Sequence, residues 1–336
     1  MAKTLEREKR AMNTMDIVTV TNLSKHYGDV TAVNGVSFSI CRGEIFGFLG
    51  PNGAGKTTTI NMMIGLARPS GGTIEINGID AVKNVKKAQS MMGIVPDESN
   101  LYDEMNGFDN LCFCGSLYGM KKAAREQRAR ELLEQFDLAK AGQRPFKAYS
   151  KGMRRKLTIA AGIIHAPEIL FLDEPTTGID VESARQIRQL LLKLKQGGTT
   201  IFITTHYIED AERICDRIAF IVDGKIVANG TVPELMQSAS HGHVIRLTAD
   251  QNLEPFAQEL QRHFGDCTVK AAGQEATLIC EEWIPLSPVL QYLDGKGVSV
   301  FEAKEIRPTL EDVFVKMTGI EAAKLQKEKE KGGMAK

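Results

Sequence analysis

The sequence predicts an α/β protein built on a parallel sheet, followed by a smaller α+β unit. Two short runs, residues 45–49 and 169–172, have the continuous hydrophobicity of buried parallel strands, and residues 199–205 indicate another buried strand. Segments with helical spacing of apolar residues separate these runs. After residue 243 the pattern changes to strand, helix, strand, strand, helix, strand, which is the order of a ferredoxin-like unit.

The bulk composition is that of an ordinary soluble globular protein. The chain has 336 residues, of which 43% are hydrophobic and 25% charged, and its 42 basic residues balance its 42 acidic ones. The zero net charge argues against a protein that coats nucleic acid. Because no run of 18 apolar residues is present, we do not expect the chain to cross a bilayer by itself.

The cysteines and the two ends of the chain carry no sign of secretion. The six cysteines are scattered and form no CxxC pair, which favours reduced thiols in a cytosolic protein and disfavours a metal site. Residues 1–15 lack an apolar core, so we expect a flexible lead-in, with Met12 or Met15 as alternative starts. The charged tail, residues 320–336, is also expected to be flexible.

The strand at 45–49 leads into a glycine-rich loop and then a helix. The segment GPNGAGKTT fits the P-loop pattern G-x-x-x-x-G-K-[ST] in the strand, loop and helix context that this pattern requires. Glycines let successive N–H groups surround phosphate oxygens. Lys56 is expected to reach the β- and γ-phosphates, and the Thr57 hydroxyl to bind Mg²⁺. The residues expected around the phosphates are Gly50, Pro51, Asn52, Gly53, Ala54, Gly55, Lys56, Thr57 and Thr58.

Two carboxylates and a histidine follow the other two predicted strands. Asp173 comes at the C-terminal end of its strand, where ligands bind in open α/β sheets, and suits coordination of Mg²⁺. Glu174 is next and is expected to polarise an attacking water. His206 ends the strand at 199–205 and is expected near the γ-phosphate and this water. The alternative for Asp173 and Glu174 is a polar turn, and the alternative for His206 is a structural role. The glycine loop upstream disfavours both alternatives.

A second helix start with the character of an anion site lies at residues 149–157, YSKGMRRKL. Ser150 is a good N-cap, and Gly152 lets a ligand approach the backbone. Three basic residues follow, so positive charge adds to that of the helix N-terminus. One chain therefore carries two helix starts that suit phosphate.

Taken in order, the glycine loop, YSKGM, LFLDEP, GID and TTH resemble the ATP-binding cassette (ABC) ATPases. The motifs cover about residues 16–236. The resemblance implies a P-loop NTPase cassette with a RecA-like core, an antiparallel β subdomain and a helical insertion at about 101–164, and it implies ATP and Mg²⁺ as cofactors. Residues 23–38 resemble the family's opening hairpin, whose Tyr27 would stack on adenine. A half-buried strand aromatic is the alternative for Tyr27.

The resemblance also gives the second helix start a role. Residues 149–153 resemble the signature motif, which caps the γ-phosphate held by a second subunit when two cassettes pack head to tail around two nucleotides. Ser150, Gly152 and Met153 would belong to that site, and Asp180 would lie at the dimer seam. Hydrolysis would then depend on dimer closure, because neither site is complete in a monomer.

Two positions depart from the family's usual pattern. Lys151 replaces a signature glycine, so that position needs no glycine conformation or tolerates strain. Asp97 follows Pro96 where the family usually has a glutamine that bonds Mg²⁺ or water and moves with the membrane partner. Asp97 can bind Mg²⁺ directly but adds negative charge, and Glu98 is an alternative for this role.

Residues 243–319 are expected to form the ferredoxin-like accessory domain. Its last helix begins at Thr309, with Asp312 three residues on, which is typical of a capping box. The expected buried stripe of this helix is Leu310, Val313, Phe314 and Met317. The segment RPTLEDVFVKMTG also resembles the closing motif of the ATPases of ABC-2-type exporters, including those of the daunorubicin-resistance type.

The resemblance thus implies an ATPase that powers export from the cytoplasmic face of the inner membrane. Its implied partners are a second cassette, either the same chain or a paralogue, and a separate multi-span permease, and no nucleic acid is expected. The alternative is a soluble ABC ATPase of DNA repair or translation, disfavoured by the lack of coiled coils, zinc hooks or tandem cassettes. A nucleotide kinase would not explain YSKGM or Glu174. The sequence does not identify the cargo.

Overall fold

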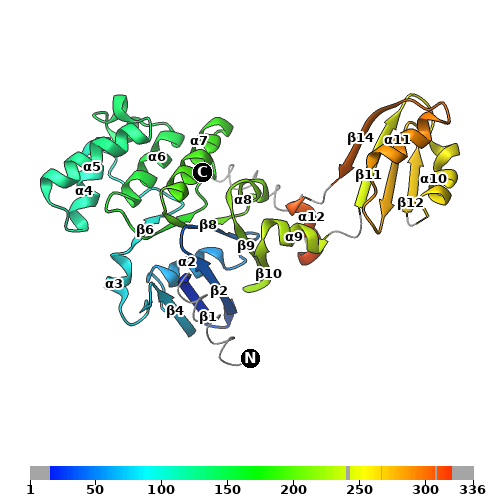
Figure 1. Cartoon of the computed structure of the whole chain (residues 1–336). Coiled ribbons are helices and arrows are strands. Elements are labelled where there is room, and N and C mark those ends of the chain that lie inside the picture. Colours follow the sequence, from blue (N-terminus) through cyan, green and yellow to red (C-terminus); the bar gives the residue numbers. More distant parts are fainter. Residues whose placement is uncertain (1–15, 240–242, 266, 307–308, 320–336) are drawn as a thin grey trace, which may run out of the picture. The chain divides into compact units, whose positions relative to one another are not determined.

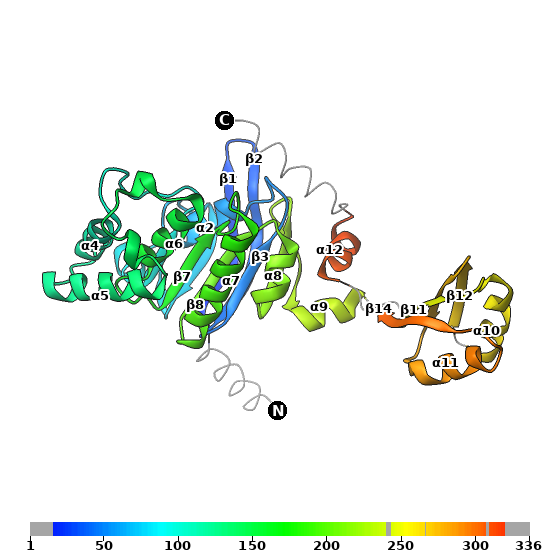
Figure 2. The same cartoon turned by 90° about the horizontal axis from the view of Figure 1, so that it is seen from above.

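The computed structural model describes residues 16–239, 243–265, 267–306 and 309–319. These residues form two compact units (Figures 1 and 2). The first reaches Val232 and takes in the end of the last helix from Met317, and the second is Pro233–Lys316. The predicted lead-in and tail, 1–15 and 320–336, lie outside the described residues.

A six-stranded sheet forms the centre of the first unit. The predicted buried strands are confirmed, since β3 and β7 are buried at every residue and pair in parallel with β8 between them. In sheet order the strands are β10 (Lys225–Thr231), β9 (Arg217–Val222), β3 (Ile45–Leu49), β8 (Thr200–Thr205), β7 (Ile169–Asp173) and β6 (Met92–Val95). The helices α2 (Lys56–Met63), α3 (Val85–Gln89), α7 (Val181–Gln196) and α8 (Ile208–Ile214) connect these strands.

An antiparallel sheet packs on this one through an aromatic core. Phe38 of the antiparallel sheet stacks on Phe46 of β3 with ring centroids 5.4 Å apart, and it lies 6.1 Å from Phe202 of β8. Burying such rings together is a main source of stability. The predicted opening hairpin is confirmed as β1 and β2. In order the strands are β2 (Val30–Cys41), β1 (Asp16–Tyr27), β4 (Gly71–Ile76) and β5 (Ile79–Asp80).

The middle of the first unit is helical. No strand occurs between residues 101 and 164, all of which the structure describes, so the helices predicted there are confirmed. Figure 1 shows α4, α5 and α6 grouped together, apart from β1 and β2. The helices are α4 (Gly107–Leu117), α5 (Lys122–Gln135), α6 (Lys151–Gly162), and the 3₁₀ turns η1 (Ala139–Ala141) and η2 (Phe146–Ala148).

A buried asparagine holds the loop that enters the helical part. The Asn110 side-chain amide donates to the carbonyls of Tyr102, Met105 and Asn106, and its oxygen accepts from the Tyr102 N–H at 2.9 Å. A fully buried amide is stable only when it is hydrogen-bonded. Asn110 therefore fixes the chain between β6 and α4, and the sequence analysis did not single it out.

The second unit has the predicted order of strands and helices. Its antiparallel sheet runs β12, β13, β11, β14, so the first strand of the unit lies between the third and the fourth, as in a ferredoxin-like fold. The elements are α9 (Val232–Ala239), β11 (His243–Ala249), η3 (Glu254–Phe256), α10 (Ala257–His263), β12 (Cys267–Ala272), β13 (Glu275–Cys280), α11 (Leu286–Asp294), β14 (Val300–Ile306) and α12 (Leu310–Thr318).

The start of α12 is confirmed and its buried stripe is partly wrong. Thr309 accepts from the Asp312 N–H at 3.2 Å, and Asp312 accepts from the Thr309 N–H at 2.8 Å, which is a reciprocal cap. Leu310, Val313 and Phe314 are buried, whereas Met317, near the end of the helix, is 37% exposed.

The expectation of reduced thiols is wrong for two of the six cysteines. Cys267 and Cys280 lie directly opposite each other in the β12–β13 hairpin and form a disulfide. Their separation of 13 residues gives no CxxC pattern, and only the hairpin register brings them together. Cys41, Cys112, Cys114 and Cys215 are free thiols.

No helix within the described ranges is both long enough and apolar enough to span a membrane.

Replacing Asn110 with Ala is expected to destabilise the first unit by about 1–3 kcal/mol, because three carbonyls and one N–H lose their buried partner. Urea unfolding of the intact chain measures this change. The exposed Lys122→Ala on α5 serves as the control and should stay within about 0.5 kcal/mol of the parent. Equal midpoints for both variants would contradict the role given to Asn110.

Candidate active site

The glycine loop is shaped by close backbone contacts on two sides. A side chain on Gly50 would begin 2.1 Å from the Ile221 carbonyl oxygen of β9, and one on Gly55 would begin 2.5 Å from the Ala32 carbonyl oxygen of β2. Gly55 also has a left-handed backbone, with φ of 101°, where it caps α2. The loop thus forms a narrow backbone cradle that ends at a helix N-terminus, as phosphate binding requires.

Lys56 points its charge into this loop. Its ammonium donates to the carbonyls of Gly50 at 2.7 Å and Pro51 at 3.2 Å, and it lies 3.4 Å from Oε1 of Glu174. The side chain is buried, and the following Thr57 is exposed at the helix start. The structure therefore brings a cation from the loop to the carboxylate at the end of β7.

The Glu174 carboxylate lies between this cation and His206. Nδ1 of His206 is 2.9 Å from Oε2, and the Thr177 hydroxyl donates to the same oxygen at 3.2 Å. Burial alone would raise the pKa of Glu174, but the hydrogen bond and charge of His206, together with Lys56, hold this pKa below its ordinary value. An ionised carboxylate in this position can accept a hydrogen bond from water.

Asp173 precedes Glu174 and is held by the next strand. Asp173 and Thr204 are directly paired between β7 and β8, and the Thr204 hydroxyl donates to the Asp173 carboxylate. The aspartate is largely buried. Sequence reasoning missed Thr204, although the register of two predicted parallel strands would have pointed to it.

Asp97 lies just beyond β6, next to a buried arginine. Its Oδ1 is 3.5 Å from Nη2 of Arg155, and its side chain is 53% exposed. Partial burial raises the pKa of Asp97 above its ordinary value, against the lowering effect of Arg155 and with the repulsion of Asp173 and Glu174. Asp97 therefore lies at the same edge of the sheet as Asp173 and Glu174. Its partner Arg155 was not singled out from the sequence.

The second predicted helix start is confirmed. Ser150 caps α6 and accepts from the Met153 N–H at 3.3 Å. Lys151 is the first helical residue, so this position does not need glycine. A side chain on Gly152 would begin 2.2 Å from Oγ of Ser183, so the packing of α7 already demands glycine there.

Asp180 has a role within its own chain. It caps α7, accepting from the Ser183 N–H at 2.8 Å and from the Ser183 hydroxyl at 2.7 Å. These bonds lower the pKa of Asp180, with the Ser183 hydroxyl as the largest cause. Asp180 therefore orders the same serine that packs against Gly152.

Tyr27 ends β1 with its ring 52% exposed, and Nζ of Lys25 lies 4.7 Å from the ring centroid. An exposure of about half fits both an adenine-stacking ring and a half-buried strand aromatic, so the adenine role of Tyr27 stays a prediction.

Comparison with known proteins decides the family. A family model described as "ABC transporter" matches residues 33–177. The linearmycin resistance ATP-binding protein of Bacillus subtilis is 35% identical over 89% of this chain and 97% of its own length. The daunorubicin resistance ATP-binding protein DrrA3 of Streptomyces coeruleorubidus is 35% identical, over 90% and 96% respectively. The chain belongs to the ABC transporter family.

Solved ABC cassettes share the fold. One structure, described as the ATP binding subunit of an ABC transporter, superposes with a TM-score of 0.61 at 30% identity. The match covers 66% of this chain and 92% of the chain of that structure. A dimeric cassette in a post-hydrolysis state with ADP and Pi has a TM-score of 0.59 at 26% identity and covers 64% and 98%. This ABC protein is therefore an ATP-binding subunit with ATPase activity, and the predicted cassette fold is confirmed.

Replacing Gly50 with Ala is expected to weaken ATP binding at least about tenfold and to destabilise the ABC protein, because a backbone oxygen 2.1 Å from the new Cβ forces the loop to move. Gly53→Ala is the matched control. Alanine at the Gly53 φ of 80° costs about 1–2 kcal/mol, but no other atom lies within 4 Å of the added Cβ. Titration with a fluorescent ATP analogue measures both, and tighter binding by the Gly50 variant than by the Gly53 variant would contradict the cradle.

Proposed function

We propose that this ABC protein is the ATPase subunit of an exporter. It works as a pair of cassettes from the cytoplasmic face of the membrane and drives a separate multi-span permease. The supporting observation is the cluster of Lys56, Glu174 and His206 beside the glycine cradle. The linearmycin and daunorubicin resistance proteins support the export class, as does the Nod factor export ATP-binding protein I of Ralstonia nicotianae, which is 36% identical over 91% of this chain and 94% of its own length.

The donor set at the site suits ATP together with Mg²⁺. Thr57 offers a hydroxyl and is exposed, and Asp173 offers a carboxylate. Within the described residues, no three or more His, Cys, Asp or Glu side chains form a metal-binding cluster. Mg²⁺ commonly takes one or two protein oxygens and completes its shell with phosphate and water. Bound there, the ion would neutralise phosphate charge. The magnesium role of Asp97 stays a prediction.

Lys56, Glu174 and His206 then have separate roles in hydrolysis. Lys56 exchanges its loop carbonyl partners for phosphate oxygens, and the cradle N–H groups stabilise the charge that develops there. Glu174, kept ionised, accepts a hydrogen bond from the attacking water and orients it. Nδ1 of His206 fixes the imidazole against Glu174, which leaves Nε2 for the γ-phosphate.

The second helix start completes the site of a partner chain in this proposal. Ser150 and the backbone N–H of Gly152 face the partner's γ-phosphate, Met153 follows them in the first turn of α6, and Asp180 lies at the seam. Tyr27 stacks on the adenine. The dimeric arrangement of a related cassette with ADP and Pi supports pairing of this kind. The alternative of a DNA-repair or translation ATPase is not favoured, because the relatives named above are resistance and export proteins.

Replacing Glu174 with Gln tests this proposal. The neutral isostere should keep ATP binding but lower turnover by about 10²–10⁴-fold, since it removes the charged acceptor for the water. With ATP bound and not hydrolysed, the variant should elute from gel filtration as a dimer. Turnover assays and gel filtration with saturating ATP measure the two effects.

Glu168→Gln is the control. Glu168 precedes the same strand, β7, and pairs with Arg42 at its opposite end, so its neutralisation should change neither result. A Glu174→Gln variant that still turns over would remove Glu174 as the group acting on water. One that stays monomeric with ATP would contradict the paired cassettes.

A further inference from the structure

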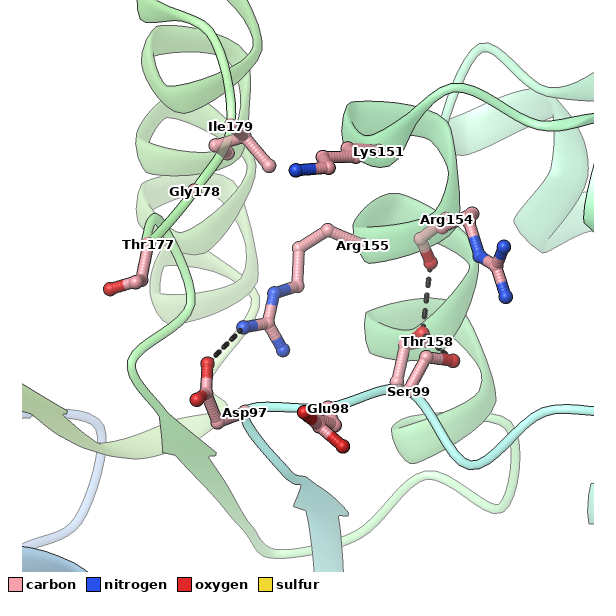
Figure 3. A pocket seen from close by; sticks show the side chains of 10 residues that line it. All are labelled: Asp97, Glu98, Ser99, Lys151, Arg154, Arg155, Thr158, Thr177, Gly178 and Ile179. Carbon is pink, nitrogen blue, oxygen red and sulfur yellow. Dashed lines mark hydrogen bonds and ion pairs between the residues drawn. The ribbon is translucent and has the colours of Figure 1, made fainter. Parts of the chain in front are cut away.

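Arg155 lines a pocket together with Asp97, next to the active-site carboxylates. The pocket has a volume of about 300 Å³ and lies between α6, the segment after β6 and the loop that leads into α7. Figure 3 shows the Arg155 side chain extending from α6 across this space toward Asp97, with Lys151 above it directed at Ile179. Arg155 is only 7% exposed, unlike its neighbours Arg154 and Lys156.

The guanidinium joins two segments that follow adjacent strands. Nη1 donates to the Pro96 carbonyl at 2.6 Å, after β6, and Nη2 donates to the Glu174 carbonyl at 2.8 Å, after β7. The ion pair with Asp97 is longer, at 3.5 Å. The two short bonds use the fixed fork of the guanidinium, which a lysine cannot reproduce. A buried cation with these partners is held in one position.

The hydrogen bond from Arg155 to Glu174 is made to a residue whose backbone conformation is unfavourable. Glu174 has φ of 47°, in the left-handed region, which costs a side-chain-bearing residue about 1–3 kcal/mol and persists only when its surroundings enforce it. Its N–H donates to the Thr204 carbonyl at 3.1 Å, and its own carbonyl accepts from Arg155 at 2.8 Å and from the Thr177 N–H of the local turn at 3.2 Å. Both peptide groups of Glu174 are therefore fixed, which sets the direction in which its side chain leaves the chain.

We propose that Arg155 is a positioning residue for ATP hydrolysis, which holds the Glu174 backbone so that the carboxylate meets Lys56 and His206. This proposal rests on the proposed function, in which Glu174 acts on the water. Arg155 also belongs to the helix that begins at Ser150. A shift of α6 on binding the partner's nucleotide therefore reaches the carboxylate of the chain's own site through one hydrogen bond.

The test compares the same substitution at two neighbouring arginines in the full chain. Arg155→Lys keeps the charge and loses the fork. We expect kcat to fall at least about tenfold, because small misplacements of a catalytic group cost one to two orders of magnitude, while the affinity for ATP changes less than about twofold. Arg154→Lys is the control. It keeps a cation beside Asp103, outside the Glu174 contact, and should have the parent kcat.

A second readout separates positioning from general support of the fold. Arg155→Ala leaves space in the pocket, so guanidinium ion at low millimolar concentration should restore part of its kcat, and methylammonium, which lacks the fork, should restore less. Neither ion should affect Arg154→Ala. Should Arg155→Ala fail to fold, the Arg155→Lys comparison still decides.

Three outcomes would overturn one or the other proposal. A parent-like kcat in Arg155→Lys, with Glu174→Gln inactive, would remove the positioning role and leave the proposed function standing. Parallel losses of kcat, ATP affinity and stability, without rescue by guanidinium, would make Arg155 a structural residue only. Turnover that survives in Glu174→Gln would overturn the proposed function itself, whatever Arg155 does.

Discussion

Glu174 has a left-handed backbone whose N–H donates to Thr204 and whose carbonyl accepts from Arg155 and from the Thr177 N–H. This constraint turns the side chain away from the strand direction and toward Lys56 and His206. The low pKa of this carboxylate follows, because burial is outweighed by the neighbours that it is made to face.

The glycine loop depends on both sheets of the first unit in a similar way. One glycine is pressed against a carbonyl of β9 and another against a carbonyl of β2, so the loop has its shape only when the antiparallel sheet is packed on the parallel one. The Phe38, Phe46 and Phe202 rings provide that packing. The phosphate cradle is therefore a product of the hydrophobic core beneath it.

Much of this could be predicted from the sequence because the signals are local. The strands β3 and β7 have continuous apolar runs, the loop has its glycines and lysine, and Ser150 and Thr309 have the chemistry of helix caps. Arg155 could not be chosen from three consecutive basic residues, because only the packing of α6 buries one of them. Thr204, Asn110 and the Cys267–Cys280 pair were missed for the same kind of reason, since strand register and loop closure bring their partners together.

In the proposed function, Glu174 acts in a site that a second chain must complete. The rate of ATP hydrolysis per chain, measured against chain concentration at saturating Mg·ATP, tests this dependence on a second chain. The rate per chain should rise with concentration and then level off as chains pair. A rate per chain that is constant down to the lowest measurable concentration, in a protein shown to be monomeric there, would contradict it.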